Sequence, residues 1–474
     1  MRSVRIGGKL RRLRQDQKLN QTQMAAELGI SPSYLNLLES NQRPVTVNIL
    51  LRLAERFKVD LTAMGGEDDG RLVTDLMEAL SDPVFDAQDI KATDVRDIVA
   101  TLPSMARAML ALYQSYRRGT ALAPVEGDSD SDAAPIGLPS EEVTDFLQAK
   151  LNYFPGLEEA AESLWHDNSL ALLTLQQDLI KVLAERFAVD LEIAPASAMP
   201  GHLRMFNPLT RKLTLSEMLP GPSRTFQLAY QIALLGHRRE IDHAVSSGKF
   251  TTPQADALAG SAMANYFAAA VMMPYDRFLA SAKSTRYDIN VLQHRFGVSF
   301  EQICHRLTTL RRPGHEGIPF HLIRVDIAGN ISKRFSASGI HIARFGAACP
   351  RWNVYDAFAT PGMVRVQVSR MPDNSSYFCV ARTIDTAARI SPRGGLPSRI
   401  GQLAVGLGCA VHFAKELVYA DGLNLDDPQI VTPIGVSCRV CPRGDCADRA
   451  MPSLSQRLEI DENKRGLSTY AMQI

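Results

Sequence analysis

The sequence predicts a mainly α-helical protein of several domains, with strands confined to two regions. Its 474 residues, 45% of them hydrophobic, exceed what one hydrophobic core usually supports. Apolar residues recur at helical spacing through residues 5–60 and over most of 139–315. From about residue 318, alternating segments around turns predict strand pairs instead. We therefore expect domains at residues 1–65, 66–118, 139–315 and 316–474, with a linker at 119–138.

The first sixty residues predict four short helices with one buried face each. Asn20 can cap the second helix, and Gly29 can end it because glycine adopts the left-handed conformation readily. Ser31 and Pro32 then begin the third helix as N-cap and first helical residue. A helix, a glycine turn and a second helix at this length are typical of a helix-turn-helix.

The polar residues of this segment predict duplex DNA as its partner. Residues 1–60 hold eleven Lys or Arg against five Asp or Glu, on a chain whose net charge is +1. Arg11, Arg12 and Arg14 suit phosphate contacts, and the start of the third helix suits the major groove. The expected DNA-binding residues are Gln21, Gln23, Ser31, Ser33, Tyr34, Asn36, Asn41 and Arg43. The run LNQTQMAAELGISPSYLNLLESNQRPVTVNILLRLAERF resembles the Xre/Cro-type repressor family.

The segments around the linker predict a helical connector. Residues 119–138, TALAPVEGDSDSDAAPIGLP, are acidic and small and lack an apolar period, as linkers do. Before them, residues 94–118 read as a helix with one apolar side, which suits dimerisation and packing within the monomer equally. Its apolar positions are Val95, Ile98, Leu102, Met105, Met109 and Leu112.

The whole-chain composition favours a cytoplasmic protein that spans no membrane. No apolar run reaches about 18 residues, and the basic N-terminus leads directly into the first helix without a signal peptide. The seven cysteines are an odd number, and all lie at residue 304 or later. This usage favours metal or redox chemistry over a disulfide framework.

Two segments, RTFQLAYQIALL at 224–235 and GSAMANYFAAAVMMP at 260–274, resemble the zinc peptidase-like domain of the ImmA/IrrE family. That family carries His-Glu-x-x-His on one helix and a third ligand, Glu, on another. Here Tyr230 and Leu234 replace the histidines, Gln231 the general base and Met263 the third ligand. We expect a degenerate zincin-like α+β domain without peptidase activity, whose old cleft is either a ligand pocket or only a scaffold.

The cysteines near the C-terminus predict a metal site. Cys438, Cys441 and Cys446 have a C-x2-C-x4-C spacing, and Cys409 is the best fourth ligand, with Cys349 as its competitor. Four thiolates suit zinc or an iron–sulfur cluster, and the spacing does not decide between them. The region from residue 316 is therefore expected to be a small α/β sensor-like domain with a cysteine metal site.

Several long segments resemble the short-chain fatty acyl regulator family. They are ANYFAAAVMMPYDRFL, HRFGVSFEQICHRLTTLRRPG, IPFHLIRVDIAGNISKRFSASG, CPRWNVYDAFATPG and PIGVSCRVCPRGDC. The resemblance implies transcriptional control of propionyl-CoA or related pathways, with CoA or acyl-CoA as effector. It also tips the metal site toward a [4Fe–4S] cluster, with zinc as the alternative. The candidate effector-binding residues are Arg224, Tyr230, Arg295 and Arg306.

The resulting hypothesis is a non-enzymatic, cytoplasmic transcription factor that binds operator DNA as a homodimer or homotetramer. A redox or iron sensor acting through the cysteines is the alternative, and a DNA-associated metallopeptidase is a third hypothesis that the missing ligands disfavour. Residues 288–310 also resemble a helix-turn-helix, and either a second DNA reader or a packing unit would produce that pattern.

Overall fold

The computed structural model forms two compact units. It describes residues 10–11, 13–14, 17, 19–39, 43, 45–57, 67–85, 88, 90–121, 139–344, 348–385, 402–453 and 468. Unit 1 comprises Met1–Ser129, Ala343–Gly346 and Val436–Ile474, and unit 2 comprises Asp130–Ile342 and Ala347–Gly435. None of the helices within these ranges combines the length and apolar character needed to cross a bilayer.

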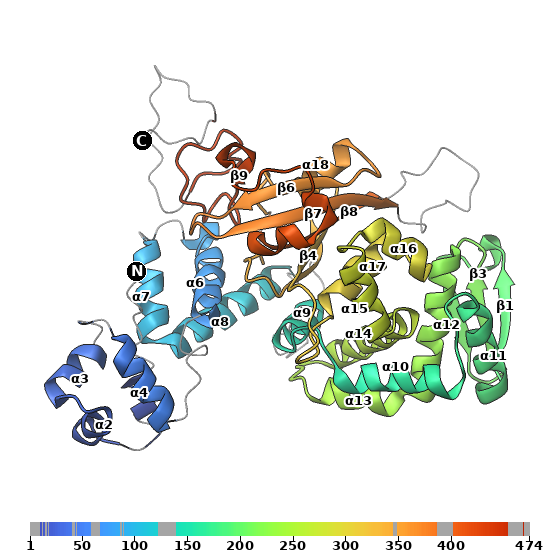
Figure 1. Ribbon diagram of the computed structural model, residues 1–474, viewed down its shortest axis with the longest axis horizontal. Helices are drawn as coiled ribbons and strands as arrows, with labels where there is room; N and C mark the ends of the chain where they lie inside the picture. The colour runs from blue at the N-terminus through green and yellow to red at the C-terminus, as the bar shows by residue number, and fades with distance from the viewer. Residues whose placement is uncertain are drawn as a thin grey trace, which may run out of the picture. The chain divides into compact units, whose positions relative to one another are not determined.

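The helix-turn-helix predicted from the first sixty residues is confirmed in unit 1. It consists of α2 (Gln21–Leu28), α3 (Pro32–Glu39) and α4 (Val47–Phe57), all blue in Figure 1. Asn20 caps α2 through a capping box, and Gly29 ends the helix with a φ of 64°. The apolar faces meet in a small core of Leu10, Met24, Ala25, Leu28, Leu35, Leu38, Ile49 and Leu53.

The connector contains two helices where the sequence pattern predicted one. After α6 (Glu67–Ala79), α7 (Ala92–Thr101) ends before Pro103, where α8 (Pro103–Ala121) begins. Proline lacks the N–H needed inside a helix and suits its first position, so the chain turns there. The three helices share a core that includes Leu76, Val99 and Leu110. Of the linker expected at 119–138, only 119–121 are described, as the end of α8.

Unit 2 begins with a bundle of helices that carries a three-stranded sheet. The strands are β1 (Asp190–Ala194), β2 (Arg204–Asn207) and β3 (Lys212–Ser216), in the order β1-β3-β2. The antiparallel β2–β3 hairpin confirms the predicted strand pair, whereas the parallel strand β1 was not foreseen. The helices are α9 (Pro139–Ala149), α10 (Pro155–Asp167), α11 (Leu175–Phe187), α12 (Gly221–Gly236), α13 (Arg238–Ser246), α14 (Pro253–Met272), α15 (Tyr275–Ser284), α16 (Ile289–Phe296) and α17 (Phe300–Thr308).

A six-stranded sheet completes unit 2, in the order β5-β4-β8-β7-β6-β9. The pairs β4–β5 and β6–β7 are those predicted from the sequence, and a short helix, α18 (Asn353–Asp356), precedes β6. The strands are β4 (His321–Asp326), β5 (Ile331–Ser336), β6 (Arg365–Arg370), β7 (Ser376–Asp385), β8 (Gln402–Ala410) and β9 (Val431–Pro433).

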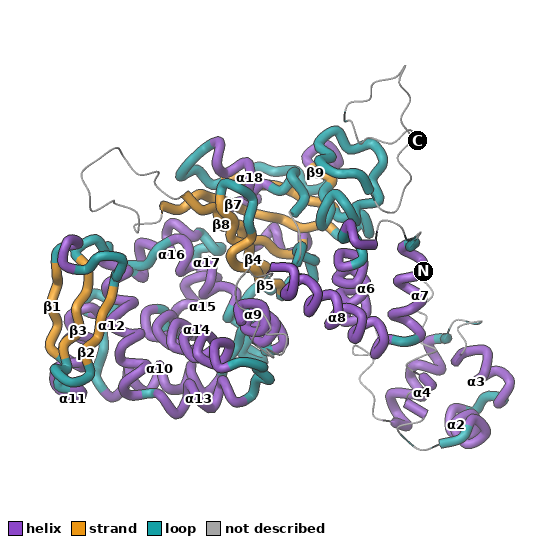
Figure 2. The backbone as a smooth tube through the Cα atoms, turned by 180° about the vertical axis from the view of Figure 1, so that it is seen from behind, coloured by secondary structure: helices purple, strands orange, loops and turns teal. Residues whose placement is uncertain are grey.

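The helices and the larger sheet of unit 2 share one hydrophobic core. Phe267 of α14, Leu307 of α17 and Phe378 of β7 belong to the same buried cluster. In Figure 2 the strands of the larger sheet lie beside α16 and α17, which carry the helix-turn-helix pattern of residues 288–310. Helix α17 is in contact with β4 and β8, so this segment packs within unit 2.

Candidate functional sites

The N-terminal end of α3 presents polar side chains to solvent. Ser33 and Asn36 are exposed and Tyr34 is half-buried. Two other expected DNA-binding residues act as caps, since Ser31 Oγ accepts the backbone N–H of Tyr34 at 3.1 Å and Gln23 Oε1 accepts that of Asn20 at 2.9 Å. The first bond lies at the start of α3 and the second at the start of α2. Arg43 is exposed, and Asn41 lies outside the described residues.

A buried carboxylate, Glu39, connects the helices of the helix-turn-helix through hydrogen bonds. Arg14 donates to both of its oxygens at 2.6 and 3.1 Å, and Gln21 Nε2 donates to it at 3.0 Å. Burial opposes its ionisation, but these hydrogen bonds outweigh burial and lower the pKa of Glu39. Arg14 is thus held inside the domain instead of facing phosphate as expected, and Gln21 links Glu39 to Asn36 Oδ1 at 3.4 Å.

Arg449 organises the cysteine loop, which we define as residues 436–453 of unit 1. Its side chain is 5% exposed, and it donates to the carbonyl oxygens of Cys438 at 2.8 Å and Cys441 at 3.0 Å. It also donates to the carbonyl oxygen of Arg443. Ser453 Oγ adds a further bond to the Cys441 carbonyl at 3.1 Å. One buried guanidinium therefore fixes the backbone on both sides of the C-x2-C pair.

Two arginines of the loop act on the Cys441 thiol. Cys441 is buried, while Cys438 and Cys446 are partly exposed. Burial raises the pKa of the Cys441 thiol, and the charges of Arg449 and Arg443 oppose that rise. The Ala450 N–H points at Cys438 Sγ, 3.4 Å away. Cationic side chains and an N–H–S bond suit a loop that holds an anionic thiolate group.

The candidate fourth ligands belong to unit 2. Cys409 lies on β8 with its side chain in the hydrophobic core, and burial raises the pKa of its thiol well above the usual range. Cys349 is also buried. The sulfur atoms of Cys438, Cys441 and Cys446, all of which the structure describes, do not lie within 4.8 Å of one another as a group. The loop therefore offers three cysteines to a thiolate-bound group without gathering their sulfur atoms at one point, and the metal site and its fourth ligand stay predictions.

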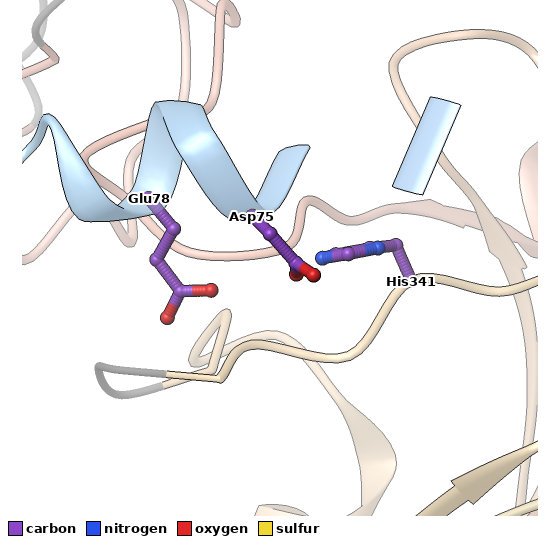
Figure 3. A group of neighbouring side chains, drawn as sticks. All are labelled: Asp75, Glu78 and His341. Carbon is purple, nitrogen blue, oxygen red and sulfur yellow. The ribbon is translucent and has the colours of Figure 1, made fainter. Parts of the chain in front are cut away.

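The cysteine loop is attached to the connector within unit 1. Arg439, beside Cys438, donates to the backbone carbonyl of Ser81 just after α6. On α6 itself, Glu78 accepts the backbone N–H of Arg344 at 2.7 Å, and Asp75 lies 3.8 Å from the Arg344 guanidinium. Figure 3 shows both carboxylates on α6. His341, drawn with them, is a residue of unit 2.

The peptidase-like segments fold as expected but cannot hold zinc. Tyr230, Gln231 and Leu234 lie on α12 and Met263 on α14, and we call these four residues the remodelled centre. Gln231 and Met263 are buried, and Leu234 packs against the core. A phenol, an isobutyl group and a thioether replace the two imidazoles and the carboxylate that bind zinc in the family, and an amide replaces the general base. The Tyr230 hydroxyl donates to Ser261 Oγ at 3.2 Å, which joins α12 to α14.

Two other residues expected to bind the effector, Arg295 and Arg306, lie on the surface and in the core, respectively. Arg295 is exposed on α16. Arg306 is completely buried and pairs with Glu158 at 2.6 and 2.9 Å, so it belongs to the core and does not face a ligand as expected. Its guanidinium also donates to the Thr309 hydroxyl and the Met273 carbonyl, each at 2.9 Å. The expectation failed because burial of an arginine with its partner leaves no mark in the local sequence.

Family comparisons match the chain in three consecutive parts. A helix-turn-helix model matches residues 10–63, an IrrE N-terminal-like domain matches 184–308, and the C-terminal domain of short-chain fatty acyl coenzyme A regulators matches 309–470. The last two meet between residues 308 and 309, near the boundary expected at 315.

Curated relatives match over nearly their full length. The HTH-type transcriptional regulator RamB of Mycobacterium tuberculosis is 40% identical over 99% of both chains. PrpR of the same organism is 39% identical over 98% of this chain and 95% of its own. The propionyl-CoA carboxylase regulator of Cereibacter sphaeroides is 40% identical over 98% of both. A solved Mycobacterium tuberculosis transcriptional regulator, 40% identical, superposes with a TM-score of 0.66 over 70% of this chain and 99% of its own.

A helix-turn-helix joined to a larger unit with a remodelled peptidase centre defines a DNA-binding transcriptional regulator, not a peptidase. Similarity to curated regulators over nearly the full chain identifies the family to which this regulator belongs. The chain belongs to the short-chain fatty acyl coenzyme A regulator family of HTH-type transcriptional regulators.

Proposed function

We propose that this regulator acts in the cytoplasm on genes of propionyl-CoA or related short-chain acyl-CoA metabolism, with CoA or an acyl-CoA as its effector. The observation that carries the proposal is the full-length match to a regulator named for propionyl-CoA carboxylase, together with the family description. The exposed Ser33 and Asn36 at the start of α3 support the DNA-reading part. Asn can pair bidentately with adenine in the major groove.

The DNA-reading part is tested with the promoter of a propionyl-CoA carboxylase operon. Wild-type protein should bind this fragment more tightly than scrambled DNA at moderate salt, where non-specific contacts weaken. Asn36→Ala should reduce that preference by about tenfold, the cost of one base contact of 1–3 kcal/mol. Asn48→Ala, at an exposed position on α4, is the matched control. Equal affinity of wild-type protein for both fragments would contradict the proposal.

The chain is further proposed to bind DNA as a homodimer through α8, with a homotetramer as the alternative. Leu102, Met105, Met109, Leu112 and Tyr116 follow the alternating three- and four-residue spacing of a coiled-coil seam. Met105 is 57% exposed and Leu112 72% exposed. Met109 also packs against the connector core. Such a seam would place two helix-turn-helix domains on adjacent half-sites, about 34 Å apart.

The cysteine loop is proposed to hold a [4Fe–4S] cluster, with zinc as the alternative. Cys438, Cys441 and Cys446 would be ligands. A cluster would supply a redox-active group, whereas zinc would supply a closed structural site. Measurement of iron, sulfide and zinc in protein purified without oxygen separates the two. Absence of all three at more than trace level would contradict the proposal.

A redox or iron sensor remains the second candidate function. It is favoured by the bond from Arg439 to Ser81, because this bond joins the cysteine loop to the connector helices of the same unit. Cys441→Ser distinguishes the two functions. If the response to CoA esters persists in that variant, the metal group is structural. If all regulation is lost while CoA esters still bind, the cluster is the primary signal.

A further inference from the structure

Arg204 brings a positive charge to the remodelled centre of unit 2. It extends from β2, and its guanidinium carbon lies 4.4 Å from the centroid of the Tyr230 ring. The same group donates to Gln231 Oε1. Gln231 stands where the related peptidases have their general base and is 1% exposed. A guanidinium held by an amide and an aromatic face therefore lies beside the positions where those peptidases hold zinc.

This cation has no anionic partner in the described part of the chain. No carboxylate there lies within 4.0 Å of Arg204, although other arginines of unit 2 pair with Asp or Glu. Burial lowers the pKa of Arg204, and the nearby Tyr230 opposes that shift. A guanidinium has five N–H donors, and only one bond, to Gln231, is made among the described residues. The other nitrogen atoms of Arg204 make no hydrogen bond to the described residues, and they are accessible to solvent.

Further donors border the same centre. Ser261 Oγ accepts from Tyr230, which leaves the serine hydroxyl hydrogen available to another acceptor. Arg224 precedes Gln231 by seven residues, or about 10 Å along α12, and lies on the same side of the helix. Its Nε is buried without a partner among the described residues, while one terminal nitrogen donates to the Glu217 carbonyl at 2.9 Å. Several hydrogen-bond donors therefore border this centre.

We propose that the remodelled centre is a binding site for an oxyanion of a small metabolite, a carboxylate or a phosphate group, received by the guanidinium of Arg204. The planar fork of arginine matches two oxygens of either group. Gln231 and Tyr230 hold the fork in place, and the Ser261 hydroxyl offers a further donor. Arg204 would then supply the positive charge that zinc supplies in the related peptidases. This inference rests on the proposed function and deepens it, because Tyr230 and Arg224 are among the residues expected to bind the effector. The two can fail separately, because the titration below measures anion binding in the absence of DNA.

The test is calorimetric titration of the full-length protein with sodium phosphate and, separately, sodium propionate at constant ionic strength. Wild-type protein should bind at least one of them saturably, with one site per chain. Saturation by propionate alone identifies a carboxylate site, and saturation by phosphate alone identifies a phosphate site. Arg204→Gln should weaken binding about tenfold or more, because a charged hydrogen-bond donor is lost. Arg239→Gln, at an exposed position on α13, should leave it unchanged.

Gln231→Glu provides the sharper test. Its carboxylate would pair with Arg204 from within, so anion binding should be abolished although the arginine remains and the fold gains an ion pair. If Arg204→Gln fails to fold, Gln231→Glu still tests whether the remodelled centre binds an anion. The proposal is overturned if neither anion binds wild-type protein saturably, or if Gln231→Glu binds them as tightly as wild type does.

Discussion

Arg449 shows how one residue can prepare a site without being a ligand. It ties together the carbonyl oxygens of Cys438, Cys441 and Arg443, so three segments of the cysteine loop depend on one buried side chain. Its charge also favours thiolates nearby. The spacing of the cysteines predicts a metal site, but nothing in the spacing reveals that an arginine eleven residues after Cys438 holds the loop.

Replacing Arg449 by Gln should therefore impair the loop more than the fold. We expect the affinity for the metal group to fall by about tenfold, within the range for loss of groups that orient metal ligands, and the metal content of the purified protein to fall with it. The cysteines should also react faster with a thiol-alkylating reagent in metal-free protein, because the loop opens. Arg365→Gln, at an exposed position on β6, is the control. Unchanged metal content and unchanged alkylation in Arg449→Gln would refute this role.

Glu158 and Arg306 form the most deeply buried ion pair of unit 2 that the structure describes. Both are almost inaccessible, at 1% and 0% exposure, and the Tyr266 hydroxyl donates to Glu158 at 2.6 Å. Glu158→Gln should reduce the free energy of unfolding by about 3–5 kcal/mol, because it leaves the arginine charge buried without compensation. Denaturant unfolding measures the loss.

Two further variants give this prediction its controls. Glu162→Gln removes the partner of Arg312 at a solvent-accessible pair and should cost about 1 kcal/mol or less. The double variant Glu158→Gln/Arg306→Met removes both charges and should recover part of the loss. If Glu158→Gln and Glu162→Gln cost the same, the buried pair does not have the role assigned to it.

At the scale of elements, the sequence predicted what is local and missed what depends on distant contacts. Capping residues and glycine turns located α2 and α3, and alternation located the β2–β3, β4–β5 and β6–β7 pairs. Strand β8 was missed because QLAVGLGCA is apolar and glycine-rich without alternation, as expected of a central strand buried on both faces. Arg204 was missed because its contacts with Tyr230 and Gln231 join residues 26 and 27 positions apart.

Helix α8 gives the element-scale prediction. Leu112→Lys places a charge in the proposed seam and should shift the protein from dimer to monomer in sedimentation experiments, with dimerisation weakened by at least tenfold. The interior of the connector should be unaffected, because Leu110 and Tyr113 form its core from another side of the helix. Ala111→Lys, exposed and outside the seam, should leave the dimer intact. A Leu112→Lys protein that dimerises like wild type would place the interface elsewhere.

At the scale of the whole molecule, the compact units do not follow the order of segments along the chain. The cysteine loop lies near the end of the sequence but joins the N-terminal connector in unit 1, whereas the helices and larger sheet of unit 2 share a core across the boundary expected at residue 315. Sequence patterns locate segments along the chain, and they do not show which distant segments share a core. The helix-turn-helix and the cysteine loop therefore belong to the same compact unit.

The central claim is that DNA binding responds to short-chain acyl-CoA. The most direct measurement is the affinity of the full-length protein for the promoter of a propionyl-CoA carboxylase operon, by fluorescence anisotropy at fixed salt, with and without propionyl-CoA or CoA. The account predicts a change in dissociation constant of at least fivefold with the ester or CoA, the lower range of allosteric coupling. An affinity for the promoter that neither compound changes at saturating concentration would contradict it.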